Sequence, residues 1–188
     1  MKKAFAVMRL DARVYLQSGK IILPILLLGC VLGVLYAVTP VDAVGSAGIS
    51  SAALFFIAAA LGLSYAWSEE TMFAQTLSVK LGYGCHMAMQ SVFLTLCALG
   101  MGVLAVAVPT ALGLLIPGFY SRSLTALDVF SALSLNALLA LNGAALGALF
   151  SPRVFPDRKF ACVVCLLAGL VGLAGPLMGL PAWALWLF

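Results

Sequence analysis

The chain has 188 residues, of which 64% are hydrophobic and only 9% are charged, and its formal net charge is +4. A soluble domain carries about 25% charged residues, so this sequence has too few to cover a water-facing surface. The small positive charge gives no support for nucleic-acid binding. One histidine and six acidic residues leave little material for a catalytic site. The composition is that of an all-α, polytopic membrane protein.

Five apolar segments could cross a membrane, which takes about 20 mostly apolar residues. They divide a transmembrane domain over residues 21–188 into spans at about 21–39, 47–67, 87–109, 126–150 and 160–175. The third apolar run continues to Ile116, but we expect its helix to end or kink near Pro109, because proline lacks the N–H that a helix needs. Beyond Gly175 the apolar sequence is interrupted by Pro176 and Pro181, which predicts a half-span or re-entrant segment.

The basic residues are distributed asymmetrically between these spans. Nine of the ten fall before the first span, between the second and third, or between the fourth and fifth: Lys2, Lys3, Arg9, Arg13, Lys20, Lys80, Arg153, Arg158 and Lys159. Only Arg122 falls on the other side. Since the cytoplasmic loops of membrane proteins are enriched in Lys and Arg, we expect a cytoplasmic N-terminus and a location in the inner (cytoplasmic) membrane.

Two cytoplasmic segments are predicted to be helical. Residues 1–20 have the pattern of an amphipathic helix lying on the membrane surface, and its apolar face holds Phe5, Met8, Ala12, Tyr15 and Leu16. The second segment, about 69–79, follows Ser68, a good N-cap residue, and begins with Glu69 and Glu70, which the helix dipole favours in a first turn. A short helix is therefore predicted between the second and third spans.

Two amides and a pair of glycines mark the fourth span. Asn136 and Asn142 would need hydrogen-bond partners within hydrocarbon. Gly143 and Gly147 form a GxxxG motif, which lets two helix backbones approach closely. The favoured interpretation is contact between helices, and the alternative is a substrate pathway or a dimer interface.

No catalytic or metal-binding motif is present. His86, at the start of the third span, is interpreted as structural, with a proton relay as the less favoured alternative. Cys162 and Cys165 form a CxxC without the second pair that a metal site would need. Since the sequence has no P-loop, the chain is not expected to bind a cofactor or to hydrolyse ATP itself.

The order of these parts resembles the membrane subunits of ABC-2 type transporters, to which the haem-exporter permeases are related. In that family the N-terminal helix is an elbow helix, and the loop after the second span is a coupling helix that seats in a separate ATPase subunit. The loop here is similar in its acidic start, its Thr-Leu pair and its closing lysine, though it lacks the family's usual glycine and later proline. The residues that the resemblance assigns to coupling are Glu69, Glu70, Thr71, Gln75, Thr76 and Lys80.

The resemblance implies a non-catalytic subunit that moves a substrate out of the cell. Its expected partners are an ATP-binding cassette subunit carrying ATP and Mg²⁺, a second permease subunit that is identical or different, and the lipid bilayer. A second hypothesis is a substrate-binding membrane module similar to the S-components of vitamin importers, with Tyr120, Arg122 and Asp128 as the main candidates for an outer pocket. A third is a structural subunit of a larger membrane complex.

Overall fold

The computed structural model describes residue 9 and residues 12–13, 15–67, 82–152 and 154–174. Its main helices are α2 (Ile22–Leu35), α3 (Ala43–Ala66), α5 (Tyr83–Leu115), α6 (Ala126–Leu149) and α7 (Arg158–Ala174). This described part contains no β-strand, which confirms the prediction of an all-helical protein. By length and composition, α3, α5 and α6 could each cross a membrane, and α2 is a shorter apolar helix.

Several helix bounds differ from the predicted spans. α3 and α5 begin at Ala43 and Tyr83, four residues earlier than predicted, and the ends of α2 and α5 also differ. α2 ends at Leu35, and the chain then turns through Tyr36 before a cis peptide bond between Thr39 and Pro40. α5 continues through Pro109 and ends only at Leu115, so of the two expectations, an end or a kink near the proline, the end is wrong. Proline is tolerated inside apolar helices where neighbouring groups compensate for the lost hydrogen bond.

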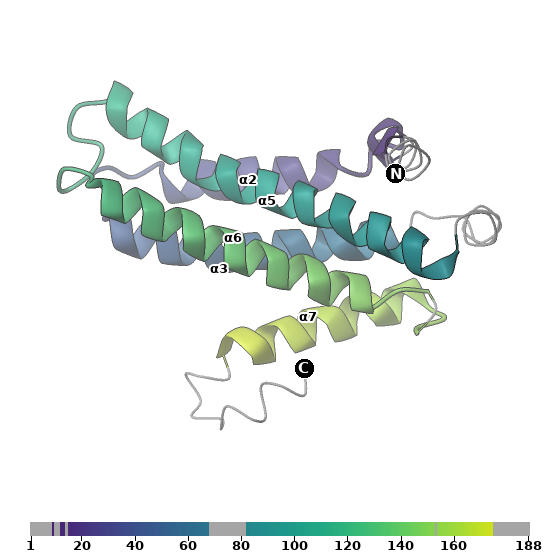
Figure 1. Cartoon of the computed structure of the whole chain (residues 1–188). Coiled ribbons are helices and arrows are strands. Elements are labelled where there is room, and N and C mark those ends of the chain that lie inside the picture. The colour runs from purple at the N-terminus through teal and green to yellow at the C-terminus, as the bar shows by residue number, and fades with distance from the viewer. Residues whose placement is uncertain (1–8, 10–11, 14, 68–81, 153, 175–188) are drawn as a thin grey trace.

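The helices lie side by side, and their connections gather at two ends of the bundle (Figure 1). At one end, the α2–α3 loop is hydrogen-bonded to the α5–α6 loop: the Val41 N–H donates to the Phe119 carbonyl at 2.9 Å, and the Ser121 N–H donates to the Val41 carbonyl at 3.1 Å. We call this the bridged end. The opposite end holds the C-terminus of α3 at Trp67, and we call it the Trp67 end.

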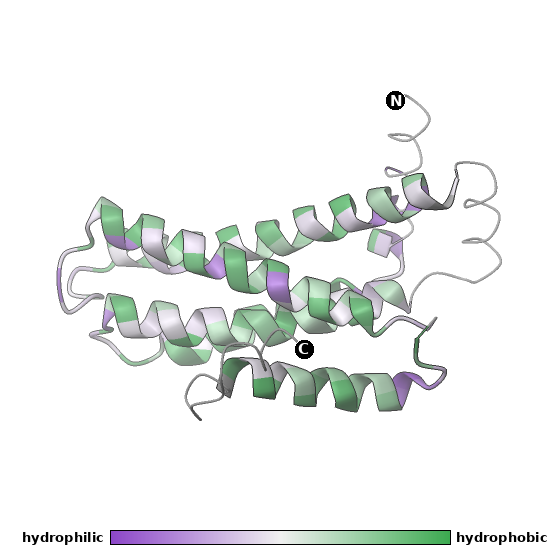
Figure 2. Ribbon diagram, turned by 60° about the horizontal axis from the view of Figure 1, so that its bottom comes forward, coloured by the Kyte–Doolittle hydropathy of each residue, from purple (hydrophilic) through white to green (hydrophobic). Residues whose placement is uncertain are grey.

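Charged residues separate between the two ends. Among the described basic residues, the Trp67 end carries Arg9, Arg13, Lys20, Arg158 and Lys159, whereas Arg122 lies in the α5–α6 loop at the bridged end. Between the ends, the helices carry mostly apolar residues (Figure 2). The described chain is therefore an apolar bundle with a strong difference in positive charge between its two ends.

The tightest contact in the bundle joins α3 and α6, which run parallel. A Cβ atom on Gly143 would meet the backbone of Phe55, and one on Gly147 would meet Ala59 and the nitrogen of Leu63, the latter at 2.7 Å. A Cβ atom on Gly62 of α3 would likewise meet Ala144. At these points only hydrogen atoms separate the two helices, so their backbones pack directly against each other.

Candidate functional site

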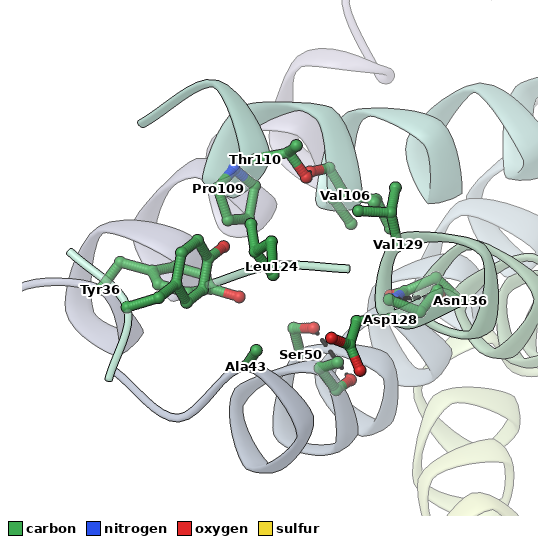
Figure 3. A pocket seen from close by; sticks show the side chains of 14 residues that line it. Tyr36, Ala43, Ser50, Val106, Pro109, Thr110, Leu124, Asp128, Val129 and Asn136 are labelled. Carbon is green, nitrogen blue, oxygen red and sulfur yellow. Dashed lines mark hydrogen bonds between the residues drawn. The ribbon is translucent and has the colours of Figure 1, made fainter. Parts of the chain in front are cut away.

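A cleft opens at the bridged end between α3, α5, α6 and the loop segments that follow α2 and α5 (Figure 3). Its cavity volume is about 30 Å³, which is enough for about one or two water molecules. Its polar wall consists of six side chains: Tyr36, Ser50, Thr110, Tyr120, Asp128 and Asn136. Polar groups that converge on a concave site between helices are the usual setting for a small ligand or for ordered water.

Asn136 is one of the buried polar residues that line this cleft. Its side chain is 1% exposed, and its Nδ2 donates to the carbonyl of Ala132 at 2.8 Å, one turn earlier in α6. Its Oδ1 is buried and accepts no hydrogen bond within the described residues. An unsatisfied buried acceptor costs about 1–3 kcal/mol, so this oxygen favours a bound hydrogen-bond donor in the cleft.

The other groups deep in the cleft also present acceptors. The hydroxyl of Ser50 donates to the Ala47 carbonyl at 3.0 Å, and that of Thr110 donates to the Val106 carbonyl at 2.7 Å. Because both hydrogens are held by the residues' own helices, the lone pairs are what these hydroxyls offer. Pro109 adds to this, since it lacks the N–H that would bond the carbonyl of Ala105. The interior of the cleft therefore suits a ligand that donates hydrogen bonds.

An ion pair and a helix cap order the mouth of the cleft. Asp128 and Thr125 form a capping box at the start of α6, with the Thr125 hydroxyl donating to the Asp128 Oδ2 at 2.7 Å. The other oxygen of Asp128 accepts from Arg122 Nη2 at 2.8 Å. Asp128 is thus a neutralised, fixed carboxylate rather than a free one.

Aromatic rings form the opposite side of the mouth. The ring of Tyr36 stacks on Phe119 with centroids 5.8 Å apart, and Phe119 meets Tyr120 edge-on at 5.0 Å. The ring of Tyr120 lies over Gly113 of α5, where a Cβ atom would come within 2.7 Å of its Cδ2. Burial, together with the neighbouring Tyr36, raises the pKa of Tyr120 to about 12.

At the Trp67 end, the helix termini are held together. The indole N–H of Trp67 donates to the carbonyl of Phe150 at 2.9 Å, which joins the ends of α3 and α6. Close by, Tyr15, Tyr65 and Phe93 pack with ring centroids between 5.2 and 5.9 Å apart. This aromatic cluster connects the residues before α2 with α3 and α5.

The predicted coupling residues Glu69, Glu70, Thr71, Gln75, Thr76 and Lys80 lie outside the described residues, as does most of the predicted 1–20 helix. Of the apolar face predicted there, Tyr15 is buried at 2% exposure, whereas Leu16 is exposed. The N-terminal and coupling helices therefore stay predictions.

The four residues predicted on the fourth span face in different directions. Asn136 points toward the cleft, and Gly143 and Gly147 pack against α3. Asn142 is exposed on the surface of α6, where its Nδ2 donates to the Leu138 carbonyl at 2.9 Å. These residues do not form one site.

Sequence reasoning missed Tyr36, Ser50 and Thr110 as cleft residues. Each follows or lies within an apolar run, and a hydroxyl there usually bonds its own helix, so the sequence carries no signal that separates these residues from others of their type. In the described part of the chain, no group of three or more His, Cys, Asp or Glu could hold a metal ion. His86 is fully buried near the start of α5.

Comparison of the chain with protein-family models, with curated proteins and with solved structures finds no match in any of the three. Within the described residues, the fold is all-helical and contains three helices long and apolar enough to cross a membrane.

Proposed function

We propose that this chain is the membrane-spanning permease subunit of an ABC-2 type transporter, which exports its substrate with energy from a separate ATP-binding cassette subunit. In this proposal the chain crosses the inner membrane five times, and the Trp67 end faces the cytoplasm. The charge difference between the two ends of the bundle supports that orientation, since positive residues favour the cytoplasmic side.

The observation that carries the proposal is the hydrogen bond between Trp67 and Phe150. The segment predicted to contact the ATPase, about 69–79, leaves α3 directly after Trp67. Because α3 is hydrogen-bonded to α6 at this point and packs on it backbone to backbone, a force applied to the segment would act on both helices as one body.

The contact between α6 and α5 is looser. Where the two helices cross, a Cβ atom on Gly102 would lie 3.5 Å from the backbone of Ala137, an ordinary van der Waals distance. The α3–α6 pair can therefore shift relative to α5 more easily than α3 can separate from α6. The cleft lies along this boundary, because its polar groups come from both sides of it. A push at the Trp67 end would change the shape of the cleft at the bridged end.

The test is copurification of the full-length chain with its ATPase after charge reversal of Glu69 and Glu70 to lysine. We expect the double variant to lose the ATPase while its circular dichroism stays that of the wild type. The matched control is Lys159→Glu, which reverses an exposed charge at the same end of the bundle and should leave copurification unchanged. Undiminished copurification of the Glu69→Lys/Glu70→Lys variant would contradict the proposed function.

The orientation is tested separately by single-cysteine labelling in intact cells. In a background without the five native cysteines, Arg122→Cys should react with a membrane-impermeant maleimide and Lys159→Cys should not. Both positions are exposed in the structure, so access to the reagent depends on the side of the membrane. The opposite labelling pattern would reverse the proposed orientation.

A second candidate function is a substrate-binding membrane module, and the cleft is the observation that favours it. Tyr120 and Asp128, two of the three side chains predicted for an outer pocket, line it, and Arg122 is paired to Asp128. Such a module would bind its ligand in detergent without any ATPase present. Binding that requires the ATPase would favour the permease instead.

A further inference from the structure

One polar side chain in the middle of α6 lies on the outside of the bundle. Asn142 is exposed, and the structure records one hydrogen bond for its side chain, from Nδ2 to the Leu138 carbonyl. The amide oxygen and the second amide hydrogen remain available on the surface of the molecule. Asn142 is seven residues from the end of α6 at Leu149, which places it about 10 Å into the helix.

This exposure is costly if α6 crosses a membrane. Exposed serines on the same helix, Ser131 and Ser134, satisfy their hydroxyls on carbonyls three residues earlier. An asparagine amide has two donor hydrogens and an acceptor oxygen, and a single bond to its own helix leaves most of that capacity unused. In hydrocarbon, such a group favours a hydrogen bond to another helix.

Asn142 is also the centre of a regular stripe. Its neighbours along the exposed surface follow the alternating four- and three-residue spacing of helices that pack at a shallow angle: Leu135, Leu138, Asn142, Ala145 and Leu149. The leucines of the stripe are 41%, 60% and 64% exposed. The buried residues of α6, among them Ala140, Gly143 and Gly147, lie on the opposite face against α3, so the stripe points away from the bundle.

We infer that this stripe binds the same stripe of a second copy of the chain, with the two Asn142 side chains hydrogen-bonded to each other. Two copies inserted in the same membrane with the same orientation are related by a two-fold axis along the membrane normal, which makes the two α6 helices parallel. Asn142 then meets Asn142 at the same depth. An amide is both donor and acceptor, so it is complementary to itself, and one such asparagine fixes the register of two parallel helices.

The geometry favours an identical partner over a different one. A different chain would need its own polar group at the depth of Asn142, whereas a second copy supplies that group by symmetry. The flanking leucines and Ala145 contribute apolar contact on both sides of the amide pair. This inference specifies the second membrane subunit of the proposed function, and it rests on that function only in placing α6 across a membrane.

The test measures dimer formation by the full-length chain in liposomes over a series of protein-to-lipid ratios, with single-molecule subunit counting as the readout. We expect the wild type to dimerise. Asn142→Leu should weaken the dimer about tenfold, as loss of an interhelical hydrogen bond worth 1–2 kcal/mol would do. Asn142→Gln keeps the amide and should retain most of the affinity. Thr95→Leu replaces an exposed polar residue on α5 and should change nothing.

Cysteine cross-linking locates the interface without removing the amide. In a cysteine-free background, Ala145→Cys should form an intermolecular disulfide under mild oxidation, because it lies on the stripe. The control Leu104→Cys lies on the exposed face of α5 and should not. This arm remains decisive if Asn142→Leu fails to fold.

Two outcomes would overturn the inference. The chain could stay monomeric at every protein-to-lipid ratio, or it could dimerise with Leu104→Cys cross-linking in place of Ala145→Cys. Neither of these depends on the ATPase. A dimer that forms through Asn142 in a chain that binds no ATPase would keep this inference and reject the transporter function.

Discussion

The indole N–H of Trp67 donates a hydrogen bond of 2.9 Å to the carbonyl oxygen of Phe150, a residue 83 positions later in the chain. Both residues are C-caps, Trp67 of α3 and Phe150 of α6. The bond therefore joins two helix ends at the place where the segment 68–81 leaves α3. A tryptophan at this position acts as a brace between two helices as well as an apolar side chain.

Replacement of Trp67 by phenylalanine tests this brace. The variant keeps an aromatic ring but loses the hydrogen-bond donor. We therefore expect its free energy of unfolding to fall by about 0.5–1.5 kcal/mol. If the chain is a transport subunit, substrate-stimulated ATP hydrolysis should also fall, and by more than the loss of folded protein explains, because α3 and α6 no longer move together. Thermal unfolding in detergent and ATPase assays of the reconstituted complex measure the two effects. If the variant matched the wild type in both stability and stimulated ATP hydrolysis, the hydrogen bond would have no role in coupling α3 to α6.

Substitution at the α3–α6 contact should be severe. In Gly143→Ala or Gly147→Ala the new methyl group would meet the backbone of Phe55 or Ala59, and backbone atoms cannot move aside as a side-chain tip can. We expect a loss of about 1–3 kcal/mol from each substitution, measured as a lower midpoint of thermal unfolding.

The matched control is Gly100→Ala, since no atom lies within 4 Å of the added Cβ. This variant should be neutral, or slightly more stable, because alanine is the better helix former. If the control lost as much stability as Gly143→Ala, backbone contact would not be the cause.

Asn136→Leu separates a structural role of the cleft amide from a functional one. The Asn136 amide bonds only its own helix, and its Oδ1 is left unsatisfied within the described residues, so the leucine variant should be at least as stable as the wild type. We expect substrate transport or ligand binding to fall, because the cleft loses its buried acceptor. A large loss of stability with unchanged activity would instead identify Asn136 as a residue that holds helices together.

Tyr120 gives the protein a predictable response to high pH. In the folded chain its pKa is raised from 10.0 to about 12 by burial, with a further contribution from Tyr36. As pH rises from about 10 to about 12, the unfolded chain loses this proton while the folded chain keeps it, so stability falls with pH. Below about 10 the effect is absent, because the phenol is protonated in both states. Tyr120→Phe should therefore show a smaller loss of melting temperature over this range, and an identical loss would contradict the assignment.

The apolar runs predicted the approximate positions of the described helices, of which α3, α5 and α6 are long and apolar enough to cross a membrane. α6 shows this clearly, since it begins at Ala126 as predicted and ends one residue early. The end of α5 could not be placed in this way. α5 continues six residues beyond Pro109, because a proline is tolerated inside an apolar helix where neighbouring groups compensate for the lost hydrogen bond.

The cleft could not be predicted from the sequence, because it depends on which face of each helix is buried. Asn136 and Asn142 are six residues apart, so on an α-helix they point in different directions. The sequence alone cannot say which of them is buried. That choice follows from the α3 contact: packing at Gly143 and Gly147 turns Asn136 toward the interior and Asn142 outward. A pairwise contact between α3 and α6 therefore decides the roles of both amides.

The parallel α3–α6 pair also sets an order of events during synthesis. α3 is synthesised before α6, because α5 and two connections lie between them in the sequence. In the folded chain Ser46, Ser50 and Ser51 each donate to a carbonyl of their own turn, so these hydroxyls need no partner from α6. The close packing of α3 on α6 can therefore form only after α6 has been made.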